Sequence, residues 1–364
     1  MKIKEIIKNL EEFAPLTLQE SYDNAGLILG NREDEVKQAL ICLDVTEDTL
    51  KEAIQHKCEL IIAHHPLIFK GLKKLTGSNL VERLIVRAIK NNIAIYAIHT
   101  NLDNVKAGVN GKIAEKLGLI EPQILQSQKG LLRKLVTFCP IEQAEEVRNA
   151  LFRAGAGSIG NYDSCSFNTQ GEGTFQANEN AHPFVGNMNS LHTEKEIRIE
   201  TIYPAYKESA VLKNLFATHP YEAVAYDIFS LENILPDVGA GIIGELDKEI
   251  SETSFLKKMK DVFKVECIRH TEFLDKRIKK VAICGGSGSF LIHSAKLAGA
   301  DVFVSADIKY HDFFEADESI LLVDIGHYES EQFTKELIYG ILTKKIPNFA
   351  LRISEMETNP VKYF

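Results

Sequence analysis

The sequence lacks long hydrophobic runs. Two of the longest are Leu60–Ala63 and Ile93–Ile98, far short of the roughly 20 apolar residues that a membrane-spanning helix needs. Residues 1–10 contain no long apolar segment and show the spacing of an amphipathic helix, unlike a secretory signal peptide. We therefore expect no membrane partner.

Closely spaced cysteine pairs are also missing. The chain has six cysteines and no CxxC motif, and they are Cys42, Cys58, Cys139, Cys165, Cys267 and Cys284. Three of the six stand inside apolar runs, as buried reduced thiols do in cytosolic proteins. The pattern predicts a cytoplasmic protein and disfavours a zinc site built from thiolates.

An excess of basic residues is absent as well. The 364 residues include 51 acidic and 42 basic side chains, which gives a formal charge of −9. Because unspecific nucleic-acid binding relies on basic patches, we expect no general binding of DNA or RNA. A composition of 45% hydrophobic and 26% charged residues is typical of a globular protein, and the length corresponds to about two domains.

Short runs rich in isoleucine and valine alternate with stretches of helical periodicity. The predicted strands are residues 39–45, 60–63, 93–98, 281–284, 302–304 and 320–325. Strands that alternate with helices predict an α/β fold, and continuous apolar strands predict sheets that are covered on both faces.

The middle of the chain follows another pattern. Residues 133–230 read as strand, helix, a polar stretch, strand, helix and strand, which resembles a ferredoxin-like α+β module. We therefore predict three segments: an α/β core half at 1–127, an inserted α+β domain at 128–237 and a second core half at 238–364.

An internal repeat supports this division. Residues 41–44 and 59–65 match residues 283–286 and 301–307 at a constant offset of 242, and residues 98–103 match 326–331 at an offset of 228. Identity is low, so chance could explain any single piece, but two pieces in the same order favour a duplicated β-α-β-α-β core.

Histidines, carboxylates and glycines follow the predicted strands. These groups are His64-His65, His99 with Asp103, Cys284 to Gly288, Asp307, and His327 with Glu331. Ligands of open α/β sheets bind outside the carboxyl ends of the strands, so parallel strands would gather these residues in one crevice. Imidazole and carboxylate together suit zinc, iron, manganese or nickel.

The spacing favours two ions over one. His327 and Glu331, at positions i and i+4, would lie on one face of a helical turn. The side chains of the adjacent His64 and His65 should diverge, so each would hold its own ion, about 3.5–4 Å apart in a bridged pair. The alternative for each motif alone is a solvated surface or a helix cap.

Three further features admit two interpretations each. Residues 285–288 could cradle a phosphate at a helix N-terminus or could serve only as a tight turn. Asp307 and His311 could line the crevice or could cap a helix.

These motifs resemble the NGG-interacting-factor-three-like family of dinuclear metal-centre proteins, also known as GTP cyclohydrolase I type 2 homologues. The matching pieces are residues 22–27, 42–46, 64–69, 99–103, 305–311 and 326–331. Tyr22 stands where the family usually has tryptophan. Residues 157–162 and 219–222 are similar to segments of PII-like and CutA-like modules, which is the form of insert that long bacterial members carry.

The resemblance implies two divalent metal ions, held by His64, His65, Asp103, His327 and Glu331. Glu331 would bridge the ions. The resemblance further implies that His99, Asp307 and His311 face the substrate or orient ligands, and that the chain forms a toroidal homo-hexamer.

Three functions remain open at this point. The first is a metal-dependent hydrolase or cyclohydrolase that acts through metal-bound hydroxide on a nucleotide-like or small cyclic amide substrate, with its general acid or base among His99, Asp307 and His311. The second is a non-catalytic metal-binding or regulatory protein whose insert senses a ligand or drives oligomerisation. The third is a nucleotide-binding protein that uses residues 285–288.

Overall fold

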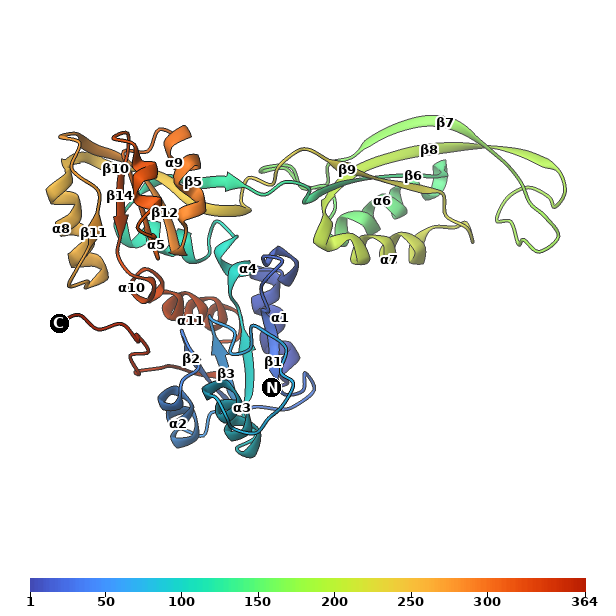
Figure 1. Cartoon of the computed structure of the whole chain (residues 1–364). Helices are drawn as coiled ribbons and strands as arrows, with labels where there is room; N and C mark the ends of the chain where they lie inside the picture. The colour runs from blue at the N-terminus through green and yellow to red at the C-terminus, as the bar shows by residue number, and fades with distance from the viewer. The chain divides into compact units, whose positions relative to one another are not determined.

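The computed structural model describes all 364 residues as a mixed α/β protein with three sheets (Figure 1). The chain divides into two compact units. Unit 1 comprises Met1–Ser127 and Pro236–Phe364, and unit 2 comprises Gln128–Leu235. The predicted α/β class is confirmed.

The first sheet of unit 1 has five strands in the order β1-β4-β3-β2-β15. Their bounds are β1 Gly26–Leu29, β2 Gln38–Cys42, β3 Leu60–Ala63, β4 Ala94–Ala97 and β15 Ala350–Ile353. Strands β15, β2, β3 and β4 run parallel, whereas β1 is antiparallel to β4. Helices in this half are α1 Ile3–Phe13, α2 Glu47–Gln55, α3 Leu80–Lys90, α4 Thr100–Asp103 and α5 Val109–Leu117, with a 3₁₀ turn η1 at Leu16–Leu18.

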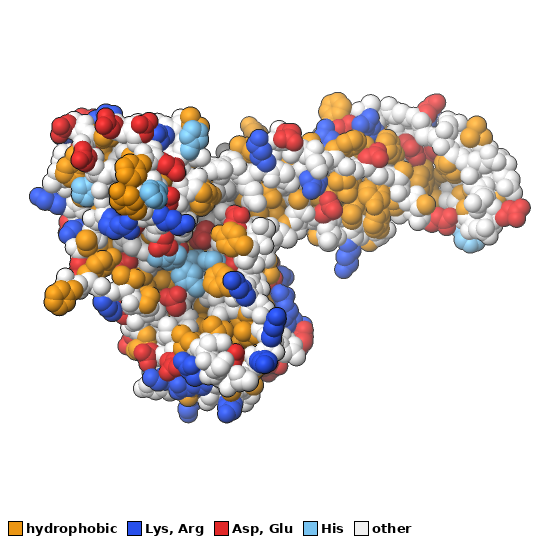
Figure 2. Space-filling view, in the orientation of Figure 1, with side chains coloured by type: hydrophobic (Ala, Val, Ile, Leu, Met, Phe, Trp, Pro, Cys, Tyr) orange, Lys and Arg blue, Asp and Glu red, His pale blue; other side chains and the backbone are white.

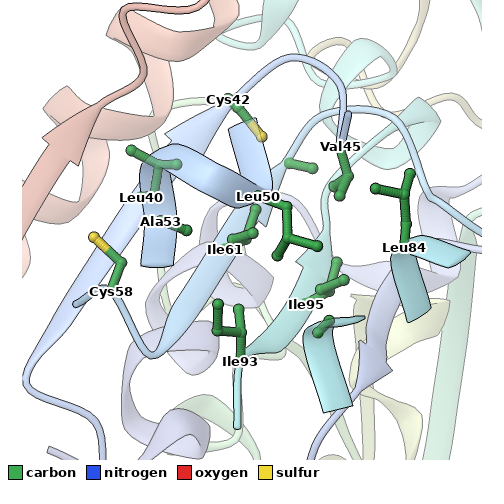
Figure 3. Close-up of a cluster of buried hydrophobic side chains, with 12 residues drawn as sticks. Leu40, Cys42, Val45, Leu50, Ala53, Cys58, Ile61, Leu84, Ile93 and Ile95 are labelled. Atoms are coloured by element: carbon green, nitrogen blue, oxygen red, sulfur yellow. The ribbon is translucent and has the colours of Figure 1, made fainter. Parts of the chain in front are cut away.

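A buried hydrophobic core fixes helices α2 and α3 on one face of this sheet. Leu40, Ile61 and Ile95 come from neighbouring strands and pack in one cluster with Leu50 of α2 and Leu84 of α3 (Figure 3). All five are essentially inaccessible to water. Burying each of these side chains stabilises the fold by about 1.5–3 kcal/mol, which holds the carboxyl ends of the strands in place.

The second sheet of unit 1 has six strands in the order β11-β14-β13-β12-β10-β5. Their bounds are β5 Ile120–Ser127, β10 Gly239–Ser251, β11 Arg269–His270, β12 Arg277–Ser287, β13 Val302–Ala306 and β14 Leu321–Asp324. Helices here are α8 Glu252–Phe263, α9 Ile292–Leu297, α10 His327–Glu331 and α11 Thr334–Lys345, with 3₁₀ turns η4 Ser289–Leu291 and η5 Asp312–Ala316.

The two sheets repeat the same arrangement. The order β4-β3-β2 corresponds to β14-β13-β12, all parallel, and each set is flanked by an antiparallel strand, β1 or β11. Ala39 pairs with Leu60 and Val281 with Val302, which is the offset of 242 found in the sequence. The duplicated pattern is therefore present in the strand pairing itself.

The two halves of unit 1 exchange edge strands. Strand β5, from the first half of the chain, pairs antiparallel with β10 in the second sheet. Strand β15, from the end of the chain, pairs parallel with β2 in the first sheet. Each sheet is therefore completed by the other half.

Unit 2 contains a four-stranded antiparallel sheet in the order β7-β8-β6-β9. Its elements run in the chain order β6 Leu132–Pro140, η2 Ile141–Gln143, α6 Ala144–Arg153, β7 Phe167–Gln176, β8 Leu191–Pro204, η3 Ala205–Lys207, α7 Glu208–Thr218 and β9 Tyr226–Leu231. Leu135, Ile199 and Tyr203 of the sheet pack against Leu151 of α6 and Val211 of α7.

None of the helices in either unit combines the length and the apolar character that crossing a membrane requires.

Candidate metal centre

Four histidines of unit 1 converge where strands of the two sheets end. His64 and His65 follow β3 directly, His99 follows β4, and His327 begins α10 after β14. The ring centroids of His65 lie 5.3 Å from those of both His99 and His327. Figure 2 shows histidine side chains gathered in a hollow of unit 1.

Glu331 contacts two of these histidines. Its Oε2 atom is 3.0 Å from Nε2 of His65 and 3.1 Å from Nε2 of His327, and these two nitrogens are 3.4 Å apart. His327 and Glu331 occupy the first and last positions of α10, so one helical turn presents both side chains together. Groups of this kind are known metal ligands.

His64 and Asp103 form another part of the cluster. Nε2 of His64 lies 3.7 Å from Oδ1 of Asp103 and 3.8 Å from Oε1 of Glu331. Nε2 of His64 and Oδ1 of Asp103 are buried, and neither has a hydrogen-bond partner. Oε2 of Glu331 is buried as well, with the imidazole nitrogens of His65 and His327 as its polar neighbours. Folded proteins rarely leave buried polar atoms without partners, and a cluster of such atoms is typical of a site that binds an ion.

Nδ1 of each of the four histidines lies within hydrogen-bond distance of an oxygen outside the cluster. Nδ1 of His64 lies 2.8 Å from the carbonyl oxygen of Ile98. For the other three histidines, Nδ1 lies 2.7–2.8 Å from a carboxylate, in the pairs His65–Asp44, His99–Asp23 and His327–Asp307. A proton donated outward from Nδ1 leaves the Nε2 lone pair of the neutral ring directed into the cluster, as in metal-binding histidines.

The pKa values of the clustered histidines depend on burial and on the neighbouring carboxylates. Burial lowers the pKa of His64 to about 4 and keeps that ring neutral. Burial also disfavours charge on His65, but its hydrogen bond to Asp44 and the adjacent Glu331 outweigh burial and raise its pKa to about 10. His327 behaves in the same way, with a pKa of about 9.

The two carboxylates shift in opposite directions. Burial, reinforced by the neighbouring Glu331, raises the pKa of Asp103 well above its usual value. Burial acts on Glu331 too, but the close His327 and His65 side chains outweigh it and hold the Glu331 pKa well below its usual value. The closely spaced lone pairs of these side chains repel one another unless a proton or a metal ion lies between them. Metal binding would therefore release protons from the histidines.

One expectation about the two adjacent histidines is wrong. The rings of His64 and His65 do not diverge; their centroids are 4.8 Å apart, and their ligand atoms form one group with His99 within 4.8 Å. The backbone bends after Ala63 instead of continuing as extended strand, so the alternation of side chains stops there. A second possible group is His65, His327 and Glu331.

The other predicted site residues fall in different places. Asp307 lines the same cavity and orients His327 through Nδ1. His311 does not line this cavity; it is exposed, with its ring 5.2 Å from that of Tyr310. The structure therefore gives His311 no contact with the cluster.

The glycine turn after β12 serves the cluster. The amides of Gly285 and Gly286 donate hydrogen bonds to Asn110 and Ser330, so they are not free to bind a phosphate. Gly286 has φ +63°, and a Cβ atom there would collide with Glu331 Oε1. The turn therefore needs glycine to make room for the carboxylate.

The cluster opens into a cavity of about 840 Å³. Tyr22, Phe69 and Cys284 are among the residues that line it. The C-terminal segment forms another part of the wall, where Thr358 donates a hydrogen bond to Asp44 and Asn359 donates one to Glu329.

Three supporting residues carry roles that the sequence alone did not predict. Asp23 and Asp44 lie within recognised motifs, yet their contacts with His99 and His65 join residues 76 and 21 positions apart. Thr358 is 314 positions from Asp44. Carboxylates that follow apolar strands were a signal for Asp44, whereas no spacing rule points to Thr358.

Comparisons with known proteins identify the family of the chain. A family model described as Duf34/NIF3 (NGG1p interacting factor 3) matches residues 1–360. The chain is 39% identical to a "GTP cyclohydrolase 1 type 2 homolog" of Bacillus subtilis, over 99% of this chain and 98% of the relative. It is 37% identical to the protein of the same name in Halalkalibacterium halodurans, over 98% of both chains.

Solved structures show the same fold over the full length. A Bacillus cereus protein related to NIF3 is 39% identical, with a TM-score of 0.89 and coverage of 100% of this chain and 99% of that one. A Staphylococcus aureus protein is 30% identical with a TM-score of 0.80, again over 100% and 99%. The resemblance inferred from the motifs is confirmed: the chain belongs to the Duf34/NIF3 family.

Proposed function

We propose that the protein is a metal-dependent hydrolase with a dinuclear centre. The ligands of the two divalent ions would be His64, His65, Asp103, His327 and Glu331, with Glu331 shared between the ions. Imidazole and carboxylate ligands without thiolate suit zinc, iron, manganese or nickel.

One observation carries this proposal. Nε2 of His64 and Oδ1 of Asp103 are buried without partners, and His64 Nε2 lies 3.7–3.8 Å from the nearest oxygens of Asp103 and Glu331. With metal–ligand bonds of about 2.0–2.2 Å, atoms spaced in this way can share an ion. Leaving these two atoms unpaired would destabilise the fold by about 1–3 kcal/mol each.

Bound divalent ions would polarise a substrate oxygen and lower the pKa of water toward neutrality. The residues of the chain then have separate tasks. His99 is the proposed proton-transfer group, because Asp23 holds its Nδ1 at 2.8 Å and leaves Nε2 facing the cluster. Burial acts against charge on Asp23, but hydrogen bonds from His99 and Thr100 outweigh burial and lower its pKa to about 2, so it stays an anion.

The proposed substrate class is a nucleotide-like molecule or a small cyclic amide. A cavity of about 840 Å³ is within the size range of pockets that enclose small organic ligands. Relatives bear the name "GTP cyclohydrolase 1 type 2 homolog", and this name supports a hydrolytic reaction on a heterocyclic ring. Asp307 would position His327, whereas nothing supports a role for His311 beyond the sequence motif.

The metal ligands can be tested with a matched pair of glycine variants. Gly286→Ala adds a Cβ that collides with Glu331, whereas Gly118→Ala has a similar φ of +67° and meets nothing within 4 Å. Both variants carry similar backbone strain, so we expect metal analysis to show loss of metal only in Gly286→Ala. His65→Ala and Glu331→Ala should also lose metal; unchanged metal content in these two would refute the ligand assignment.

Catalysis needs a separate measurement. Metal-loaded protein should turn over at least one member of a panel of nucleotides, phosphoesters and cyclic amides, and His99→Ala should slow that turnover while retaining metal. Tight metal retention with no turnover across the panel would favour the alternative, a metal-binding or regulatory protein.

We also propose that the chain assembles into a homo-hexamer, as the family resemblance implies. Light scattering of the purified protein should give a mass six times that of one chain. A monomeric mass at micromolar concentration would contradict this assembly.

A further inference from the structure

Unit 2 contains a second cavity, separate from the metal centre, with a volume of about 570 Å³. Its floor is the face of the sheet that carries Gly171 and Gly173 of β7 and Glu196 and Arg198 of β8. Figure 1 shows the long β7–β8 hairpin of this unit, whose tip loop contributes Pro183 and neighbouring residues to the wall.

Aromatic rings form much of the wall. The rings of Phe175 and Phe184 both lie near Tyr221, with centroids 6.1 Å and 6.3 Å from its ring centroid, and Phe138 also lines the cavity. Gly171 has no atom within 4 Å of the place where a Cβ would be, so the floor is open at that point. Flat apolar ligands suit a space of this kind.

A segment at residues 219–222 builds one side of the cavity. His219 donates from Nε2 to the carbonyl of Phe138 and accepts the amide of Tyr221 at Nδ1, a pattern that requires a neutral ring. Burial lowers the pKa of His219, in agreement with this pattern. Glu222 then accepts the backbone amide of His182 at 2.8 Å, which ties the hairpin tip to this segment.

Glu196 is a mostly buried carboxylate that lines the cavity. The residue is only 8% exposed, and its Oε1 accepts the hydroxyl of Tyr221 at 2.8 Å. No donor contacts its other oxygen, Oε2. This oxygen lies close to Gly173, since a Cβ atom on Gly173 would collide with it. This oxygen is free to accept a hydrogen bond from a ligand in the cavity, and a cationic donor makes the strongest such bond.

The charge balance of the cavity also favours a cation. Glu172, Glu196 and Glu222 line it, and the single basic residue is Arg198. Arg198 pairs at 3.0 Å with Glu200, which does not line the cavity and also pairs with Lys134, so three carboxylates face one guanidinium in the lining. Faces of aromatic rings attract cations as well.

We propose that this cavity binds a small organic cation with a flat apolar body, and that an N–H group of the ligand donates to Oε2 of Glu196. The site lies wholly within unit 2 and does not depend on the metal centre. It gives the inserted segment a ligand of its own.

Calorimetric titration of the full-length protein with three isosteric probes tests the proposal. The probes are the 2-naphthamidinium cation, neutral 2-naphthamide and anionic 2-naphthoate. We expect the cation to bind about tenfold or more tightly than the amide, as the loss of a charge-assisted hydrogen bond predicts, and we expect no binding of the anion. Equal binding of all three, preference for naphthoate, or no binding of any probe would overturn the proposal.

Variants then locate the binding site. Glu196→Gln keeps an acceptor for Tyr221 but should abolish the preference for the cation over the amide, and Gly173→Ala should weaken cation binding by displacing the carboxylate. Glu145→Gln removes the same charge from the exposed surface of α6 and should bind as the unmodified protein does. Cation binding that persists unchanged in both Glu196→Gln and Gly173→Ala would also refute the site.

Discussion

Asp44 shows how a single residue outside the proposed ligand set supports the candidate metal centre. Its Oδ1 lies 2.7 Å from Nδ1 of His65, and its Oδ2 accepts the hydroxyl of Thr358. Burial acts against charge on Asp44, but the hydrogen bond to His65 outweighs it and lowers the Asp44 pKa. An anion fixed in this way orients His65 and increases the basicity of its inner nitrogen.

Replacing this carboxylate should weaken metal binding without unfolding the protein. Asp44→Asn keeps an acceptor near His65 but removes the charge, so we expect metal affinity to fall by about 10- to 100-fold. Competition with a chromophoric chelator measures the change. Asp48→Asn, on the exposed start of α2 where Asp48 pairs only with Lys51, should keep full affinity. Equal affinity in Asp44→Asn and the unmodified protein would contradict this role.

At the scale of single residues, the sequence predicted the side chains of the cluster better than the residues that hydrogen-bond to them. His64, His65, Asp103, His327 and Glu331 follow strand ends or stand at helical spacing, and the structure brings all five together. Their assignment as ligands stays a prediction. The supporting contacts join distant parts of the chain, which local periodicity cannot show.

At the scale of single elements, the start of α3 depends on one carboxylate. Glu82, only 7% exposed, accepts the backbone amides of Thr76 and Ser78 at 2.9 and 3.1 Å. Asn79 caps the helix by accepting the amide of Glu82. These hydrogen bonds, led by the one from Ser78, lower the pKa of Glu82 to about 2.

This shift predicts a pH dependence of stability. Because the folded pKa lies below the usual value of 4.5, ionised Glu82 stabilises the fold above about pH 4.5, and this contribution is lost as the pH falls toward 2. Glu82→Gln should therefore lower the urea midpoint at pH 7, and the difference from the unmodified protein should shrink in acid.

The matched control is Glu115→Gln on α5, where Glu115 is exposed and pairs only with Lys112. Its urea midpoint should follow that of the unmodified protein at every pH. A difference for Glu82→Gln that stays constant from pH 7 to pH 3 would contradict the assignment.

Buried elements were easier to predict than edge elements. The apolar run 60–63 is β3 itself, and residues 302–304 lie within β13, because both strands are covered on both faces and carry continuous apolar residues. Strands β5 and β15 have mostly exposed or half-buried residues and gave no such signal. Their place in the sheets comes from pairing across the duplicated halves, which no local pattern contains.

At the scale of the whole molecule, the insertion point predicts that unit 1 can exist without unit 2. Ser127 at the end of β5 pairs with Gly239 at the start of β10, so the chain leaves and re-enters unit 1 at neighbouring positions. The resemblance of the inserted segment to PII-like and CutA-like modules stays a prediction.

A shortened chain tests this independence. Replacing residues 128–235 with two glycines leaves residues 236–238 to complete a short loop, so we expect the product to fold and to bind as much metal per chain as the full-length protein. Circular dichroism and metal analysis provide the measurements. An unfolded or metal-free product would show that unit 1 requires unit 2.

The exchanged strands β5 and β15 have a consequence for motion. His64, His65 and Asp103 come from one half of unit 1, and His327 and Glu331 come from the other half. In each half, the sheet includes an edge strand that belongs to the other half. Swinging the halves apart would break backbone hydrogen bonds in both sheets, so the strand exchange opposes opening of the cluster. After a break in the backbone between the halves, these strand pairings would still hold the two halves together around the same cluster.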